Sequence, residues 1–258
     1  MSAGAPVTIG ADPYYYDCMI RFGGRLRSVA GLAIAALLAV AAITSCSPGN
    51  PEILPRKDLF RLRLGKLEDA VDLFQIGGIK SQRKNRIYMR NGIFFLSNGD
   101  SNKIMEFSSY GDLLTLLYTP QDNAKPVFGS TDKVSGRVSN KQVVPYTFQE
   151  VGELAVTRSG LLLVEDRAPQ ARSVRDPRLG TKLSNVILRF DSQRRYMDYL
   201  GQEGVGGSPL PYVDGLYATN GDDIVVVCKT TTQWLVFWYT VQGLSLIHIS
   251  EPTRQRQP

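Results

Sequence analysis

Histidine is almost absent from this sequence of 258 residues, and cysteine is rare. The single histidine is His248, near the C-terminus, so none lies between Cys46 and Gly243. A Ser-His-Asp triad or a histidine-rich zinc site therefore cannot be built from that stretch. The other two cysteines, Cys18 and Cys228, provide no disulfide framework. Cys228 ends the apolar run IVVVC and is expected to be a buried, inert thiol.

A hydrophobic run long enough to span a membrane comfortably is also missing from the N-terminal region. The apolar stretch Val29–Ile43 has 15 residues, whereas a membrane-spanning helix needs about 20. Arg21, Arg25 and Arg27 precede it. A basic segment, a short apolar run and small residues before a cleavage site are typical of a secretory signal peptide. We therefore predict a signal peptide at residues 19–45 and export of the mature chain.

The end of this apolar run resembles a bacterial lipobox. An aliphatic residue, Ile43, is followed by the small residues Thr44 and Ser45 and then by Cys46. The resemblance implies cleavage before Cys46, a diacylglyceryl group on its thiol and a further acyl chain, such as palmitate, on its new amine. Two or three chains anchor a protein stably to a membrane. An ordinary signal peptide or an uncleaved N-terminal anchor is the alternative.

The segments on either side of the signal peptide differ in their expected roles. Residues 1–18 fit an exported protein poorly, and a signal peptide that starts at Met19 has the usual length. We predict that Met19 is the true start and that the first 18 residues are over-called upstream sequence. Residues 46–57 are rich in proline and include Gly49, which indicates a flexible tether between the lipid and the folded domain.

The C-terminal tail, residues 244–258, does not resemble the rest of the chain. LSLIHISEPTR, Leu244–Arg254, resembles the translation of a sequencing-library adapter over eleven consecutive residues. Segments of this kind are excluded from fold reasoning. We predict that the tail is an artefact and that the native frame continues past Gly243. A native β-strand is the alternative, because SLIHI alternates acceptably.

Composition favours a packed β-protein. Apolar residues make up 43% of the chain, which is enough for a core. Many of the 24 glycines stand in Asn-Gly, Ser-Gly or Tyr-Gly pairs, which indicates many tight turns. The net charge of +6 selects no partner. Because an exported protein rarely meets nucleic acid, no nucleic-acid partner is predicted.

A unit of alternating strands and turns recurs along the chain. Its three copies cover Ile87–Tyr118, Leu154–Gly201 and Leu216–Thr240, and their first turns carry Asn91-Gly92, Ser159-Gly160 and Asn220-Gly221. Asn-Gly between apolar runs is a strong hairpin signal because type I′ turns need positive φ at both central residues. One polar insertion lies between the first two copies, roughly at 119–150, and another within the second copy, roughly at 167–184.

These repeats predict an all-β fold over residues 58–243. A four-stranded sheet cannot bury both faces alone, and radial packing of such blades solves that problem. We predict a partial, truncated β-propeller of antiparallel four-stranded blades, because three blades cannot close a ring. A β-sandwich is the alternative. Before the first blade, Phe60, Leu62 and Leu64 alternate as in a half-buried strand, and LEDAVDLF fits a short helix or a strand.

The motifs NGIFFLSNGDSNKIMEFSSYGDLL and LEDAVDLF, together with the lipobox, resemble a spirochaetal lipoprotein family of unknown function. The blade pattern is also similar to NHL-type propeller repeats. The resemblance covers most of residues 59–243. It implies an exported, membrane-anchored, propeller-like protein, on either the periplasmic face or the cell surface. It carries no known active site, so the one functional residue it transfers is the lipid-attachment residue Cys46.

Three further features are candidates for sites. Asn98, Asp100 and Asn102 alternate in a turn, as calcium ligands do, but the glycine and glutamate that an EF-hand requires are misplaced, and such residues are ordinary turn formers. The basic stretches 80–86 and 167–178 are expected to be solvated loops or contacts to anionic lipid. The aromatic run 233–240 is expected to pack between blades, with a sugar or peptide groove as the alternative.

The function predicted from these features is binding rather than catalysis. We expect a lipid-anchored envelope protein that binds a protein or glycan partner, without a cofactor. The alternative is a metal-assisted hydrolase or lactonase that uses carboxylate and amide ligands at the propeller axis, partly from missing blades. A bare structural lipoprotein is a third possibility, and it predicts no concave aromatic or acidic patch.

Overall fold

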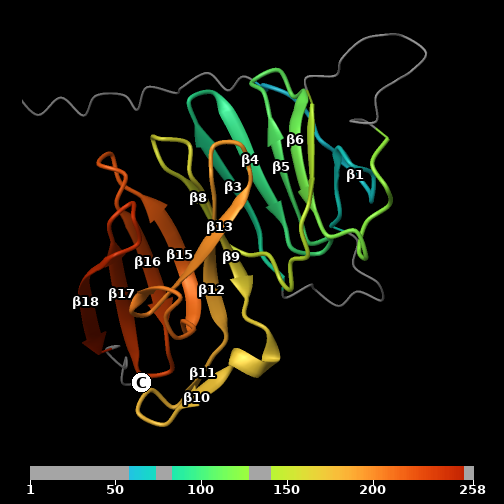
Figure 1. Cartoon of the computed structure of the whole chain (residues 1–258). Helices are drawn as coiled ribbons and strands as arrows, with labels where there is room; N and C mark the ends of the chain where they lie inside the picture. Colours follow the sequence, from blue (N-terminus) through green and yellow to red (C-terminus); the bar gives the residue numbers. More distant parts are fainter. Residues whose placement is uncertain (1–57, 74–82, 128–140, 253–258) are drawn as a thin grey trace, which may run out of the picture. The chain divides into compact units, whose positions relative to one another are not determined.

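Strands provide nearly all of the regular structure in the computed structural model, which describes residues 58–73, 83–127 and 141–252 (Figure 1). The one helical element among these residues is a 3₁₀ turn, η2, at Gln170–Arg172. No helix in the described part of the chain is long and apolar enough to cross a membrane. The all-β prediction is therefore confirmed for this part. The predicted signal peptide and Cys46 lie outside the described residues.

The first sheet contains the first predicted repeat. Its strands are β3 (Asn85–Arg90), β4 (Ile93–Asn98), β5 (Lys103–Phe107), β6 (Leu113–Tyr118) and β7 (Gln142–Pro145), in that spatial order. The first four run antiparallel, whereas β7 joins β6 in parallel. This edge strand comes from the segment that was expected to be only a polar insertion.

The β3–β4 hairpin has the turn that the sequence predicts. Arg90 pairs with Ile93, so the turn has two residues, Asn91 and Gly92. Their φ angles are 52° and 76°. Positive φ at both positions is the signature of a type I′ turn, whose twist matches that of the flanking strands.

The second sheet contains the second repeat. Its spatial order is β14 (Gly204–Val205), β13 (Tyr196–Gly201), β12 (Asn185–Phe190), β9 (Leu162–Arg167) and β8 (Leu154–Val156), all antiparallel. The insertion between β9 and β12 forms η2 and a separate hairpin of β10 (Val174–Asp176) and β11 (Thr181–Leu183). A bulge separates the pairs Arg189–Asp198 and Phe190–Tyr196.

The third sheet has four antiparallel strands: β15 (Tyr212–Ala218), β16 (Ile224–Lys229), β17 (Gln233–Tyr239) and β18 (Ser245–Pro252). The turn predicted at Asn220-Gly221 occurs, closed by the N–H of Asp222 donating to the carbonyl oxygen of Thr219, but it is not of type I′, because the positive φ of 68° falls on Asp222. The loop closes as a bend between Thr219 and Asp223. Strand β18 lies in the tail predicted to derive from an adapter. Its pairing with β17 does not test that origin, which stays a prediction.

The segment before the first sheet forms a short parallel pair, β1 (Arg63–Leu64) and β2 (Ala70–Val71). Phe60 and Leu62 pack on the outer face of the first sheet, as their alternation predicted. Leu64 is 63% exposed, so its predicted place in the core is wrong. Of the two possibilities for LEDAVDLF, the strand occurs at Ala70–Val71; Phe74 lies outside the described residues.

Two buried clusters hold the three sheets together in series. Phe95, Ile104 and Leu117 of the first sheet meet Leu162, Val164 and Leu188 of the second. The opposite face of the second sheet carries Leu163 and Ile187, which meet Val226 and Phe237 of the third. The second sheet is therefore covered on both faces, which a two-layer sandwich does not allow.

The first strand of the second sheet, β8, lies next to the first strands of the other two sheets, β3 and β15. Meander sheets that pack in series, with their first strands adjacent, are arranged as successive β-propeller blades. The fold is therefore a three-blade propeller segment, and two of its blades carry a fifth strand. We use "axis" for the place where β3, β8 and β15 meet.

Candidate functional site

Charged side chains from the first two sheets meet at the axis and contact the third sheet there. The Lys84 ammonium, just before β3, donates to Glu165 Oε2 of β9 at 2.7 Å and lies 3.6 Å from Glu153 Oε1. It also donates to the carbonyl oxygen of Val213 in β15 and stands 4.3 Å from the ring centroid of Tyr212. Lys84 thus joins the three sheets, and the prediction that residues 80–86 form a solvated loop is wrong at this position.

The two axial carboxylates are held by protein partners. Arg86 Nε donates to Glu153 Oε1 at 2.8 Å, and the backbone N–H of Glu153 donates to Glu165 Oε2 at 2.8 Å. Burial raises the pKa of Glu165, which Lys84 opposes. A Cβ on Gly152 would lie 2.1 Å from Glu165 Oε2, so a larger residue there would push the Glu165 carboxylate from this position.

The position of Lys84 bears on the alternative hypothesis of a metal-assisted hydrolase, which would need carboxylates free to bind a metal. A metal ion between Glu153 and Glu165 would have to displace the Lys84 ammonium from the position it holds. Among the residues the structure describes, no group of three or more His, Cys, Asp and Glu side chains is placed to hold a metal. The described part of the axis therefore has the composition of a structural ion-pair network.

The calcium candidates at the β4–β5 turn are occupied by contacts within the protein. Asn98 accepts the backbone N–H of Asp72 through Oδ1 at 2.8 Å and donates to the carbonyl oxygen of Asp72 at 2.8 Å, which fixes the segment before the first sheet. Asn102, with φ 47°, accepts the N–H of Val151 and donates to Asp122. These amides fasten loops, as turn formers do, and the calcium hypothesis gains no support.

Asp100, the third candidate, accepts a hydrogen bond from Asn85 Nδ2 at 3.2 Å. It thereby ties the β4–β5 turn to the start of β3. All three candidate side chains therefore have partners in the protein.

An aromatic pocket lies between the first two sheets. It has a volume of about 430 Å³. Its walls come from the 146–149 loop, from β9 and the 167–172 segment, and from β12 and β13. The lining residues are Tyr146, Thr147, Gln149, Asp166, Arg167, Ala168, Pro169, Ala171, Arg172, Val186, Leu188, Tyr196 and Tyr199. A pocket of this size, mainly apolar with a few polar groups, has the usual features of a small-ligand site.

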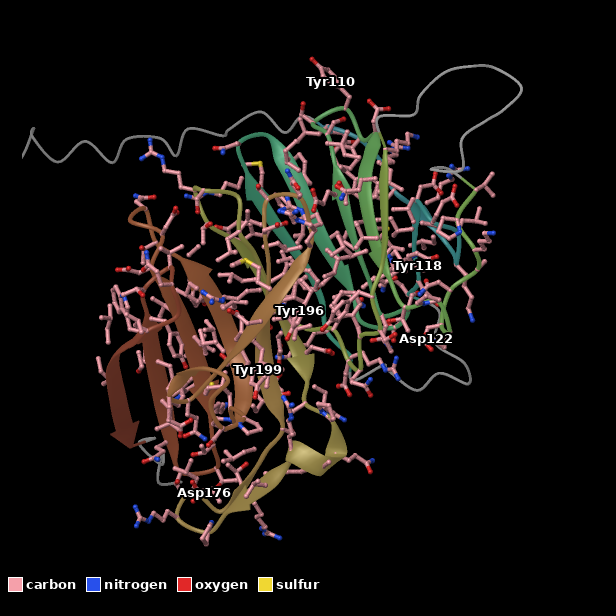
Figure 2. The ribbon with its side chains drawn as sticks, viewed as in Figure 1. Tyr110, Tyr118, Asp122, Asp176, Tyr196 and Tyr199 are labelled. Atoms are coloured by element: carbon pink, nitrogen blue, oxygen red, sulfur yellow. The ribbon has the colours of Figure 1, made fainter. Side chains whose placement is uncertain are left out.

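The bulge in β13 places two tyrosines on the same side of the second sheet. Tyr199 pairs with Leu188, and Tyr196 pairs with Phe190. Leu188 and Phe190 both face the first sheet. In a regular strand, residues three apart would face opposite sides, so the irregularity brings both rings to the pocket. Figure 2 shows Tyr196 and Tyr199 near each other along this sheet.

Aromatic contacts fix the rings of this pocket. Tyr146 lies 5.0 Å from the ring of Phe190 and 5.4 Å from that of Tyr196, centroid to centroid. Burial raises the pKa of Tyr146, and it also raises the pKa of Tyr196, so both phenols are neutral at physiological pH. Tyr196 keeps 45% of its surface exposed. The pocket therefore has a preformed aromatic wall.

Two charged groups of the pocket differ in how they are satisfied. Asp166 is buried and accepts the N–H groups of Gln149 and Glu150; burial raises its pKa to about 6. The Arg172 guanidinium lies 5.4 Å from the Tyr199 ring centroid. Within the described ranges, Arg172 has no carboxylate partner, whereas Arg167 pairs with Glu150 at 2.8 Å.

The side chains of the aromatic run 233–240 lie on both faces of the third sheet. In the aromatic run, Phe237 and Tyr239 are buried between the second and third sheets, as expected. Trp234 and Trp238 alternate with them and face the other side, where Trp238 donates to Asp223 Oδ2 at 3.1 Å and Lys229 lies over Trp234.

Of the basic residues in the 167–178 stretch, Arg167, Arg172, Arg175 and Arg178 are exposed, as expected for a solvated segment. Cys228 is fully buried, and burial raises its pKa, which fits the expected inert thiol. The backbone of His248 lies in β18, opposite Phe237.

Sequence reasoning missed the aromatic pocket. Its wall combines Tyr146, from one insertion, with Arg172, from another, and with Tyr196 and Tyr199 of β13. The three-residue spacing of these two tyrosines predicts that they face opposite sides of the sheet. The visible signal was the excess of tyrosine in RRYMDYLG together with VPYTF. A bulge is not visible in such a pattern.

Comparison with protein-family models gave no match, and a search of curated proteins gave none. Among solved structures, the chain is similar to a gluconolactonase from Xanthomonas campestris. The identity is 14% and the TM-score 0.21, over 63% of this chain and 72% of that one.

Proposed function

We propose that this protein is a binding module of the bacterial cell envelope, anchored by lipid on Cys46, and that it acts without catalysis. The observation that carries the proposal is the aromatic pocket between the first two sheets. It is concave and preformed, and it presents polar groups that have no protein partner among the described residues. The bare structural lipoprotein hypothesis predicts no such pocket.

The pocket offers hydrogen-bonding capacity to a ligand. The hydroxyls of Tyr146 and Tyr196 have no hydrogen-bond partner in the described part of the chain. Tyrosine combines a large apolar surface with one polar atom, which suits both glycan and peptide recognition. The proposed partner is therefore an envelope glycan or protein.

Catalysis is not favoured by the described groups. The two carboxylates at the axis, Glu153 and Glu165, lie in the ion-pair network with Lys84. The hydrolase or lactonase alternative would require the ammonium to leave. It is tested directly by assaying lactone and ester hydrolysis with added divalent metals; metal-dependent turnover that Glu165→Gln abolishes would overturn the binding proposal.

Binding is tested with the full chain on an array of envelope glycans and peptides. Wild type is expected to retain a defined set of ligands, and Tyr196→Ala is expected to weaken them at least tenfold. Tyr110→Ala is the matched control, because Tyr110 is 86% exposed at the β5–β6 turn, outside the pocket (Figure 2). Equal binding by all three proteins would contradict the proposal.

Anchoring is tested separately by metabolic labelling with palmitate. Wild type expressed in a bacterium is expected to incorporate label and to fractionate with membranes. Cys46→Ser is expected to lose both properties, whereas Cys228→Ser is expected to keep them. Label that persists in Cys46→Ser would refute the lipid attachment.

A further inference from the structure

We propose that the aromatic pocket binds an acidic saccharide, a hydroxylated ring that carries a carboxylate, with Arg172 as the carboxylate-binding residue. The inference rests on the proposed binding function and names the ligand class of the same site. Three kinds of group around one cavity carry it: aromatic rings, a buried carboxyl, and a guanidinium that has no carboxylate partner in the part of the chain that the structure describes.

The aromatic wall selects a ring of saccharide size. Tyr196 and Tyr199 face the cavity from one side of the second sheet, and Tyr146 lies against Tyr196. The C–H face of a sugar ring stacks on such surfaces, and hydroxyl-bearing rings match the free phenol groups. A volume of about 430 Å³ holds one or two sugar units, rather than a long peptide.

The guanidinium selects negative charge. Arg172 ends η2 and stands over the Tyr199 ring, which fixes its direction. The other arginine of the lining, Arg167, is neutralised by Glu150. A planar guanidinium that lacks a carboxylate partner in the described structure can bind a ligand carboxylate through two parallel hydrogen bonds.

The buried carboxyl selects hydroxyl donors. Asp166 Oδ1 accepts the backbone N–H of Glu150 at 2.7 Å and that of Gln149 at 2.9 Å. Asp166 Oδ2 accepts only the longer hydrogen bond from the N–H of Gln149, at 3.2 Å, of these two donors. A carboxylate has about four lone-pair sites, so Oδ2 retains capacity for a donor. A neutral ring with hydroxyls would use Asp166 and the tyrosines only, whereas an acidic sugar uses Arg172 as well.

The test is calorimetric titration of the full chain with digalacturonate and with galactobiose, its neutral counterpart. Wild type is expected to bind digalacturonate at least tenfold more tightly. Arg172→Gln is expected to reduce this preference to less than threefold, whereas Arg175→Gln, a matched change at an exposed arginine outside the pocket lining, is expected to preserve it. Tyr196→Ala is expected to weaken both ligands.

The outcomes separate this inference from the proposed function. Equal affinity for the two disaccharides, with loss of both in Tyr196→Ala, overturns the acidic-sugar inference and leaves the binding function intact. A preference that survives in Arg172→Gln overturns the role of Arg172. Binding of neither disaccharide overturns the inference, and the array of glycans and peptides then decides the proposed function independently. Circular dichroism of each variant excludes loss of folding as the cause.

Discussion

Arg194 reaches from the β12–β13 turn of the second sheet to Glu106 in β5 of the first, 88 residues away in the chain. Both side chains are buried, with 8% and 5% of the residue surface exposed. Arg194 also donates to the carbonyl oxygens of Gly160 and Asp191. This buried ion pair therefore links the first two sheets directly.

Replacing Arg194 by methionine is expected to destabilise the fold by about 3–5 kcal/mol, because a buried carboxylate then loses its partner. The double variant Glu106→Gln/Arg194→Met is expected to lose less than the sum of the single changes. Urea unfolding of the four proteins measures the coupling. Arg195→Met is the control, because Arg195 pairs with Asp191 at the surface and should change stability by less than about 1 kcal/mol. Additive effects would show that the buried pair is not coupled.

The axial network predicts a pH-dependent effect of Lys84→Met. Without the ammonium, the pKa of Glu165 is expected to rise further above its unfolded value, and a raised acid pKa means that stability falls as pH rises. The loss in the free energy of unfolding should therefore be larger at pH 8 than at pH 5. Lys66→Met, at an exposed lysine, is the matched control. A loss independent of pH would contradict the coupling of Lys84 to Glu165.

Because Asp166 is buried, the free energy of unfolding is expected to depend on pH in the mildly acidic range. Its folded-state pKa of about 6 exceeds the ordinary 3.8, so the folded chain binds the proton more tightly. Stability from this group is therefore present at low pH and is lost as pH rises from about 4 to 6, by about 3 kcal/mol. Asp166→Asn removes the titration and should flatten this slope. Thermal unfolding across this range measures it, and identical slopes in the two proteins would refute the assignment.

Lys103 holds the segment before the first sheet, residues 58–73, against β5. Its buried ammonium donates to the carbonyl oxygens of Leu67 and Ala70, both at 2.7 Å. Lys103→Met should release residues 58–73, because each lost hydrogen bond is worth about 1 kcal/mol or more. Trypsin cleavage at Arg63 and Lys66 should accelerate at least tenfold.

The control for this release is Lys125→Met, at an exposed lysine, which should cleave at the wild-type rate. Burial lowers the pKa of Lys103 to about 8. Because the folded-state pKa is depressed, the penalty for burying the charge is present below pH 8 and disappears as pH rises from 8 towards 10.5. The difference in unfolding free energy between wild type and Lys103→Met should shift over that window. Unchanged cleavage in Lys103→Met would contradict the role of this lysine.

Local patterns predicted the strands well, because hairpins are short-range structures. The repeat predicted at Ile87–Tyr118 ends at the last residue of β6 and contains the β4–β5 and β5–β6 hairpins. Asn91-Gly92 predicted its turn because both residues tolerate positive φ. Asn220-Gly221 predicted the position of its turn but not its type, because Thr219 and Asp223 close a longer loop in which Asp222 takes the left-handed conformation.

The candidate site was much less predictable, because it depends on contacts between distant segments. Lys84 looked like part of a solvated basic loop, yet its partners Glu165 and Val213 are 81 and 129 residues away. Alternation could not reveal the pocket either, since a bulge moves Tyr196 to the side that Tyr199 occupies. Single-sequence patterns identify the faces of strands, but they do not identify which faces meet.

The burial of Cys228 has a practical consequence. It is the one cysteine in the described part of the chain, and it is wholly covered between the second and third sheets. A thiol reagent in solution can therefore reach it only when those sheets separate. The rate at which Cys228 is alkylated therefore measures how often the second and third sheets separate. It reports on this one boundary between blades, and no label has to be introduced.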